Sequence, residues 1–123
     1  MKLRFRNNSL RLRVNQREVE DLAAGTALAE CVYFPGNSSL SYILEPVKSD
    51  YAEASFQQGR IHIAVPDEEV RRWAVGDTIG LYFELPVNEI QLRVAIEKDL
   101  QCVEGSPDEY DPDAFPRESG KSC

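Results

Sequence analysis

The first half of this chain recurs in its second half. A shift of the sequence by 51 positions, without gaps, aligns these identical residues: Phe5 with Phe56, Val14 with Val65, Glu18 with Glu69, Val19 with Val70, Ala23 with Ala74 and Gly25 with Gly76. Apolar positions between the identities coincide as well, so the hydrophobic period is repeated along with the letters. Such self-similarity indicates one supersecondary unit used twice, and it constrains the fold more than any other feature of the sequence.

Each copy begins with a predicted β-hairpin. Apolar and basic residues alternate through residues 3–14, which is the period of strands with one buried face. The Asn-Asn pair at 7–8 suits a tight turn that needs positive φ. The second copy repeats the pattern over residues 54–65, with Gln-Gly at its turn.

A short helix is predicted after each hairpin. Asn15 offers an N-cap and Glu18 stands three residues later, as in a capping box, and Gly25 ends this first helix. The second helix begins after Pro66 and ends before Gly76. An apolar run and another alternating run follow each helix, so each unit has the order β-β-α-β-β.

The predicted fold class is α+β, mainly β. Neither unit could cover its own apolar strand face, so the units at 3–45 and 54–97 are expected to close on one another as one barrel or two-layer sandwich, with a short helix plugging each end. We predict one domain over residues 1–103, followed by an irregular acidic tail over 104–123.

Composition excludes several classes of protein. Charged residues make up 28% and hydrophobic residues 42%, which is ordinary for a soluble globular protein. No stretch approaches the ~20 apolar residues of a membrane span, and the start has no signal-peptide core, so a cytoplasmic location is expected. The net charge of -7 argues against general affinity for nucleic acids or anionic membranes.

A known structural pattern runs from Gly59 to Ile79. A strand is followed by Pro66, a helix, and Gly76-Asp77 before the next apolar run. This stretch resembles the strand–helix–strand unit of the AbrB-like swapped-hairpin regulators, which belong to the cradle-loop barrels, although the connection between helix and glycine is shorter here. The resemblance implies a barrel and offers DNA-binding regulation as a function, against which the acidity of the chain counts.

The two ends of the chain carry a second resemblance. Residues 1–4 and 8–13 at the start, with 96–102, 113–116 and Cys123 at the end, resemble a family of small uncharacterised bacterial proteins, a domain of unknown function. The resemblance implies a bacterial cytosolic protein and brings no mechanism. It also implies that the tail belongs to the protein.

The first hairpin gathers arginines on one face. With its apolar residues turned inward, the opposite face holds Arg4, Arg6, Arg11 and Arg13. Three interpretations stay open: a solvated edge hairpin that deters aggregation, an anion site for a phosphate, nucleotide or nucleic-acid backbone, and a docking place for the acidic tail. The second copy keeps only Arg60 and His62 on this face, so any such site is asymmetric.

The tail is acidic and broken by prolines, as solvated segments usually are. Its candidate contact residues are Asp108, Glu109, Tyr110, Asp111, Asp113 and Phe115. Because apolar anchors are spaced among the carboxylates, we hypothesise that the tail folds back over the arginine face of the first hairpin.

Candidates for metal or catalytic chemistry are few. Cys102 and Cys123 could hold a metal with tail carboxylates or form a disulfide, but their spacing is far from that of zinc motifs. Cys31 lies in an apolar run and is expected to be a core thiol. No nucleophile motif is present and His62 is the only histidine, so no catalytic residue and no cofactor is expected.

The sequence therefore favours a non-enzymatic binding or interaction module. We expect its partner to be an unknown protein or an anionic ligand and expect no membrane binding. Formation of a homodimer stays an open alternative. The alternatives are the AbrB-like DNA-binding regulator and a barrel enzyme or binder for a phosphorylated anionic ligand held by the hairpin arginines.

Overall fold

The computed structural model describes residues 1–100, 113 and 115. The elements follow in this order: β1 (Lys2–Arg6), β2 (Ser9–Val14), α1 (Gln16–Ala23), β3 (Leu28–Phe34), β4 (Ser38–Val47), β5 (Glu53–Gln57), β6 (Arg60–Pro66), α2 (Asp67–Val75), β7 (Gly80–Val87) and β8 (Ile90–Lys98). The order β-β-α-β-β therefore occurs twice, as the sequence predicts.

Local signals in the sequence account for the ends of these elements. Asn7 and Gln58 have φ of 52° and 51° at the tips of the two equivalent hairpins. The side chain of Asn15 accepts a hydrogen bond from the backbone N–H of Glu18, and the Glu18 carboxylate accepts one from the backbone N–H of Asn15, both at 2.9 Å. The predicted capping box is thus present at the start of α1.

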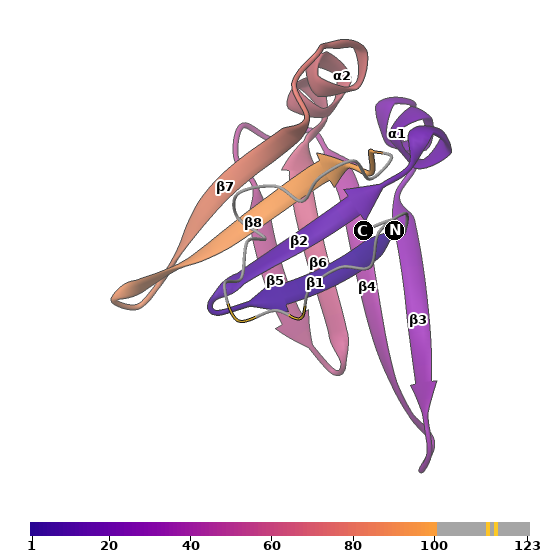
Figure 1. The fold of residues 1–123 in the computed structure, drawn as a ribbon, viewed down its shortest axis with the longest axis vertical. Helices are drawn as coiled ribbons and strands as arrows, with labels where there is room; N and C mark the ends of the chain where they lie inside the picture. The colour runs from indigo at the N-terminus through magenta and orange to yellow at the C-terminus, as the bar shows by residue number, and fades with distance from the viewer. Residues whose placement is uncertain (101–112, 114, 116–123) are drawn as a thin grey trace.

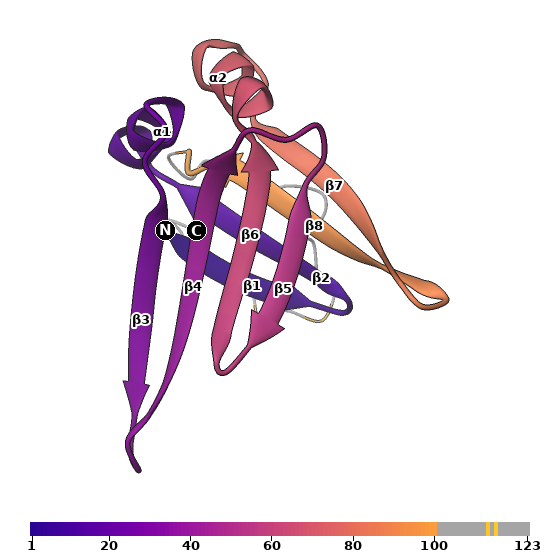
Figure 2. The same ribbon diagram turned by 180° about the vertical axis from the view of Figure 1, so that it is seen from behind.

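The strands form two sheets, and each sheet takes one hairpin from each unit. The first sheet has the order β1-β2-β8-β7 and the second has the order β3-β4-β6-β5. The hairpins of the two units meet at central parallel pairs, β2 with β8 and β4 with β6, and the other neighbours are antiparallel. Figures 1 and 2 show the sheets one behind the other with their strands crossing at an angle.

Of the two predicted arrangements, barrel or two-layer sandwich, the closed barrel does not form in the described part of the chain. Among the described strands, no pair joins the two sheets, which leaves β1, β7, β3 and β5 as edges. The physical reason is that the chain crosses between the sheets through α1, after β2, and through α2, after β6. A barrel would need strands hydrogen-bonded into both sheets. The barrel implied by the cradle-loop resemblance is therefore not found.

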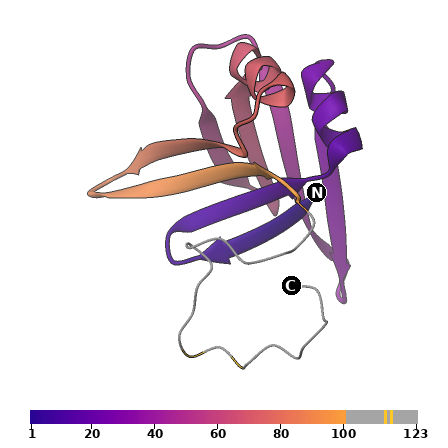
Figure 3. The ribbon, with the colours of Figure 1, turned by 45° about the horizontal axis from the view of Figure 1, so that its top comes forward.

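Both helices lie at the same end of the sheets and contact each other (Figures 1 and 3). The expectation of one helix at each end is wrong, because both helices follow strands that run toward that end. Among the described residues, no helix covers the opposite end of the two sheets (Figures 1 and 3).

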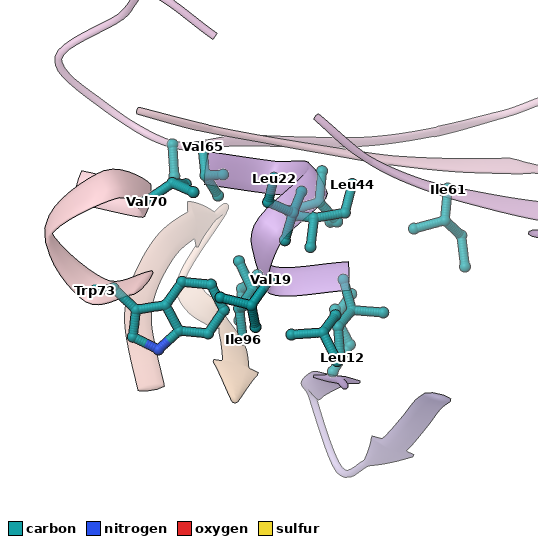
Figure 4. Close-up of a cluster of buried hydrophobic side chains, with 14 residues drawn as sticks. Leu12, Val19, Leu22, Leu44, Ile61, Val65, Val70, Trp73 and Ile96 are labelled. Atoms are coloured by element: carbon teal, nitrogen blue, oxygen red, sulfur yellow. The ribbon is translucent and has the colours of Figure 1, made fainter. Parts of the chain in front are cut away.

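One hydrophobic core lies between the sheets, beneath the helices. Its fully buried members are Leu12, Val14, Leu22, Leu44, Ile63, Val65, Val70, Trp73, Val94 and Ile96. Figure 4 shows Trp73 of α2 and Leu22 of α1 in the same cluster as Leu44 of the second sheet. The indole N–H of Trp73 donates to the carbonyl of Ile79 at 2.8 Å, so the polar atom of this buried ring is satisfied.

The inner faces of the sheets continue beyond this core. Phe5 and Phe56, near the tips of the two equivalent hairpins, share the inner face with buried neighbours but are 59% and 67% exposed. Cys31, expected in the core, is exposed instead. It lies opposite Ser41 on the outer face of the edge strand β3. On that face an apolar residue is not buried by the core.

Candidate functional site

The outer face of the first sheet gathers positive charge from both units. Arg4 lies opposite Arg11 and Lys2 opposite Arg13 in the β1–β2 pair, and Arg93 enters from β8 beside Ser9 of β2. We call this surface the basic face and define it by Lys2, Arg4, Arg6, Arg11, Arg13 and Arg93. The structure therefore brings the four predicted arginines together, and none of the four is without an interaction partner.

Glu97 is a buried carboxylate set into the basic face. The residue is 7% exposed, and its Oε1 atom lies 3.2 Å from Nε of Arg11. The hydroxyl of Tyr82 donates to the Oε2 atom at 2.6 Å. Each carboxylate oxygen thus has a partner, which a buried charge requires. Glu97 holds Arg11 in place and offsets part of the positive charge around it.

Gly80 makes room for the contact between Tyr82 and Glu97. It lies opposite Glu97 in the β7–β8 pair. A Cβ atom at this position would lie 2.7 Å from the Tyr82 hydroxyl oxygen and 2.9 Å from Cγ of Glu97. Glycine within a strand often marks such a close approach. Here the missing side chain of Gly80 lets the Tyr82 phenol reach the Glu97 carboxylate.

The residues after Glu97 divide between the two sides of the strand, as alternation predicts. Lys2 forms an ion pair with Asp99 at 2.8 Å. Lys98 instead donates to the carbonyl of Gly76 at 2.9 Å and lies 5.7 Å from the ring centre of Trp73. The acids at the end of β8, Glu97 and Asp99, are therefore both paired with cations of the basic face.

A depression of about 590 Å³ lies on the basic face. Ala95 is part of its lining and stands between Arg11 and Tyr82 in one cross-strand row, so a small side chain separates a guanidinium from a phenol ring. Arg4, Arg6 and Arg93 also line the depression. Guanidinium groups bind carboxylates and phosphates through paired hydrogen bonds, so this surface is chemically suited to anions.

The outer face of the second sheet has a different chemistry. It carries Arg60 and His62, as predicted, within a depression of about 560 Å³ whose other lining residues are mostly serine and glutamine. His62 Nε2 lies 3.3 Å from Oε1 of Glu45, and both side chains are more than one third exposed. The equivalent surfaces of the two sheets thus differ in charge, and only the first sheet concentrates cations.

A further polar cluster lies beside the N-terminus. The Met1 ammonium group pairs with Glu18, and the Tyr42 hydroxyl donates to Glu30 at 2.8 Å. Burial, the hydrogen bond to Glu30 and the negative charge of Glu30 raise the pKa of Tyr42 to about 12. The cluster keeps its phenol protonated and joins the start of the chain to α1 and the second sheet.

Several predicted residues lie outside the described residues: Cys102, Asp108, Glu109, Tyr110, Asp111 and Cys123. Of the tail residues that are described, Phe115 is 96% exposed. Within residues 1–100, 113 and 115, no group of three or more His, Cys, Asp and Glu side chains is placed to hold a metal ion. In the same residues, no helix has both the length and the apolar character needed to cross a membrane.

Sequence reasoning missed the part of the site that comes from the second unit. Alternation in residues 92–97 does place Arg93, Ala95 and Glu97 on one strand face. Nothing in the sequence, however, places β8 beside β2, because that parallel pair joins segments far apart in the chain. The sequence around Gly80 does not predict its role, because that role depends on the contact between Tyr82 and Glu97.

Comparison with known proteins adds a family. A family model described as a family of unknown function, DUF7009, matches residues 1–119. Neither a curated protein nor a solved structure matches the chain.

Proposed function

This chain belongs to the family of unknown function DUF7009, and we propose that it is a non-enzymatic interaction module whose basic face binds an acidic segment. The observation that carries the proposal is the convergence of cations from both units on one sheet face of a chain whose net charge is -7. The only buried acid among the described residues, Glu97, is engaged with Arg11 and Tyr82.

Close spacing makes this face a place where negative charge is stabilising. Directly opposed side chains in an antiparallel pair lie about 5 Å apart at Cβ, as Arg4 and Arg11 do in the register. Like charges on neighbouring side chains repel, and the repulsion is stronger beside a protein surface than in bulk water. An acidic partner relieves this repulsion and gains charge-assisted hydrogen bonds.

The acidic segment 104–113 of the same chain is the nearest candidate occupant. It contains Glu104, Asp108, Glu109, Asp111 and Asp113 and no basic residue. The segment follows β8, a central strand of the first sheet, by a few residues. An extended residue spans about 3.3–3.6 Å, so the segment is long enough to reach across the basic face. Tethering also gives it an effective concentration near the millimolar range.

A phosphorylated ligand is the second candidate occupant, favoured by the Tyr82 ring. That ring is 60% exposed and stands beside Ala95 in the depression that the arginines line. An aromatic ring next to guanidinium groups suits a ligand that carries both a planar group and a phosphate.

Replacing the tail acids by amides in the full chain tests the first candidate. The variant combines Asp108→Asn, Glu109→Gln, Asp111→Asn and Asp113→Asn. If the segment binds the basic face, the variant melts at a lower temperature than the parent in low salt, and added salt affects it less, because screening weakens an existing attraction. A melting temperature and salt dependence equal to those of the parent would show that this segment is not the occupant.

Binding to the same variant distinguishes the candidates. In the amide variant, we expect a synthetic peptide of residues 104–113 to bind. Its affinity should fall when Arg4→Gln/Arg11→Gln is added and should stay unchanged when Arg60→Gln is added on the second sheet. Binding of pyrophosphate but not of the peptide would favour the phosphorylated ligand. Binding of neither in low salt would overturn the proposal for the basic face.

A further inference from the structure

The edge strand β3 (Leu28–Phe34) is the starting point for an inference independent of the basic face. It is one of the two edge strands of the second sheet, and the hairpin it forms with β4 extends beyond the rest of that sheet (Figures 1 and 2). All of its residues after Leu28 are exposed. Among the described residues, no strand pairs with its outer side.

A single backbone hydrogen bond fixes which groups of β3 face outward. The N–H of Ser41 donates to the carbonyl of Gly59 at 2.9 Å, so Ser41 directs its backbone groups toward β6. Because successive residues of a strand point their backbone groups to opposite sides, the neighbours Leu40 and Tyr42 bond to β3. Their partners in the register are Val32 and Glu30. The intervening residues of β3 therefore direct N–H and C=O toward the open edge, and these are Ala29, Cys31 and Tyr33.

The other three edges carry features that deter pairing, and β3 lacks them. β1 bears Lys2, Arg4 and Arg6. In β8 the N–H of Arg93 donates to the carbonyl of Asn8, so by the same alternation Leu92 bonds to Leu85 of β7. The next residue of β7, Pro86, therefore faces the open edge, where it has no N–H to donate. β5 is only five residues long. Charges, prolines and short length are the means by which proteins protect sheet edges.

The strand that carries these open backbone groups also has large apolar side chains that are exposed. Val32, Tyr33 and Phe34 are 45%, 82% and 50% exposed, and they occupy both faces of the strand. A long, exposed, apolar edge is a template for pairing with another strand. Glu30 is the only charged residue in the strand.

We propose that β3 pairs in antiparallel fashion with β3 of a second copy of this chain, joining two four-stranded sheets into one continuous sheet across a two-fold axis. In antiparallel pairing across a two-fold axis, both copies use the same strand edge. That edge supplies hydrogen-bond donors and acceptors alike, which suits the pairing of β3 with β3 of a second copy. The inference does not depend on the proposed function, since it concerns the other sheet.

The open backbone groups and the single charge select the register. With Cys31 opposite the partner's Cys31, Ala29 lies opposite the partner's Tyr33, and all three outward-facing residues form hydrogen-bonded pairs. Moving to the next hydrogen-bonded register in either direction removes one of these pairs. One of those moves also places Glu30 opposite the partner's Glu30, and directly opposed like charges are destabilising. In the selected register Glu30 instead faces the partner's Val32.

This register makes Cys31 a probe of the interface. Hydrogen-bonded antiparallel pairs have Cα atoms about 5.5 Å apart. Directly opposed side chains lie about 5 Å apart at Cβ, which is within reach of a short bifunctional thiol reagent. In the full chain with Cys102→Ser and Cys123→Ser, we expect such a reagent to give a covalent dimer through Cys31.

A shifted cysteine provides the matched control. In a chain that also carries Cys31→Ser and Tyr33→Cys, the two introduced thiols are separated by about four residues along the strands, or roughly 13 Å. We expect at least tenfold less cross-linking from this position. Equal cross-linking from positions 31 and 33 would indicate random collision of exposed thiols and would overturn the register.

Sedimentation of the reduced protein tests the association itself. We expect the parent to be a dimer whose dissociation constant rises at least tenfold in Tyr33→Pro, which removes an outward N–H without breaking a bond to β4. Tyr51→Pro, at an exposed tyrosine outside the sheets, should leave it unchanged, and circular dichroism should show that both variants are folded. A monomeric parent at all concentrations, or a dimer untouched by folded Tyr33→Pro, would refute the proposal.

Discussion

Replacing Gly80 by alanine probes how tightly Glu97 is built into the basic face. The added methyl group would lie 2.7 Å from the Tyr82 hydroxyl oxygen and 2.8 Å from the ring carbon that bears it. Neither distance is compatible with ordinary packing, so the phenol must swing away. Glu97, whose Cγ would lie 2.9 Å from the methyl group, must shift as well, and it loses the hydrogen bond that Tyr82 donates at 2.6 Å.

Two opposing contributions set the size of the effect. A hydrogen bond to a charged group contributes about 1.5–3 kcal/mol to stability. Alanine in place of glycine within a strand is worth roughly 0.5–1 kcal/mol in the opposite direction, because the unfolded chain loses freedom. The lost hydrogen bond is the larger effect, so we expect Gly80→Ala to lower the free energy of unfolding by about 1–2 kcal/mol.

Urea unfolding followed by tryptophan fluorescence measures this change, since Trp73 is the only tryptophan and is buried in the core. A double-mutant cycle with Tyr82→Phe isolates the mechanism. In the Tyr82→Phe background there is no hydrogen bond left to break, so Gly80→Ala should cost at least about 1 kcal/mol less than in the parent. An additive cycle, or a Gly80→Ala variant as stable as the parent, would refute the reasoning.

Other predictions concern the core, the first helix and the N-terminal cluster. Leu44→Ala should cost about 2–5 kcal/mol in urea unfolding because Leu44 is fully buried, whereas the exposed Phe56→Ala should cost far less. Asn15→Ala removes the cap of α1 and should cost about 1 kcal/mol in the same assay, and an unchanged midpoint would contradict the capping box. Because the pKa of Tyr42 is raised to about 12, folded Tyr42 keeps its proton where the unfolded chain has lost it. Stability measured by urea unfolding should therefore fall as pH rises from 10 to 12, and Tyr42→Phe should abolish that part of the fall.

The sequence predicts the features that neighbouring residues make together. Alternation over residues 3–14, the turn at Asn7 and the Asn15–Glu18 capping box each lie within one short stretch, and the structure contains all of them. Alternation alone also places Arg4 and Arg11 on a common face of the hairpin.

The arrangement of the hairpins could not be obtained in the same way. Each sheet is assembled from one hairpin of each unit. The parallel pairs that join the hairpins place the second strand of one unit beside the fourth strand of the other. That pairing decides which residues share the basic face. The presence of Arg93 and Glu97 there could therefore not be predicted from the sequence. Cys31 shows the same limit: its apolar surroundings predict burial, but its strand ends up at an edge.

The most direct test of the central claim is a map of where an acidic peptide touches the protein. The amide variant of the tail is titrated with the peptide of residues 104–113, and backbone amide shifts are recorded by NMR in low and in high salt. We expect shifts concentrated on β1, β2 and β8, around Arg4, Arg11 and Ala95, with affinity falling as salt rises. Shifts around His62 on the second sheet, or no shifts in low salt, would contradict the claim that the basic face binds an acidic segment.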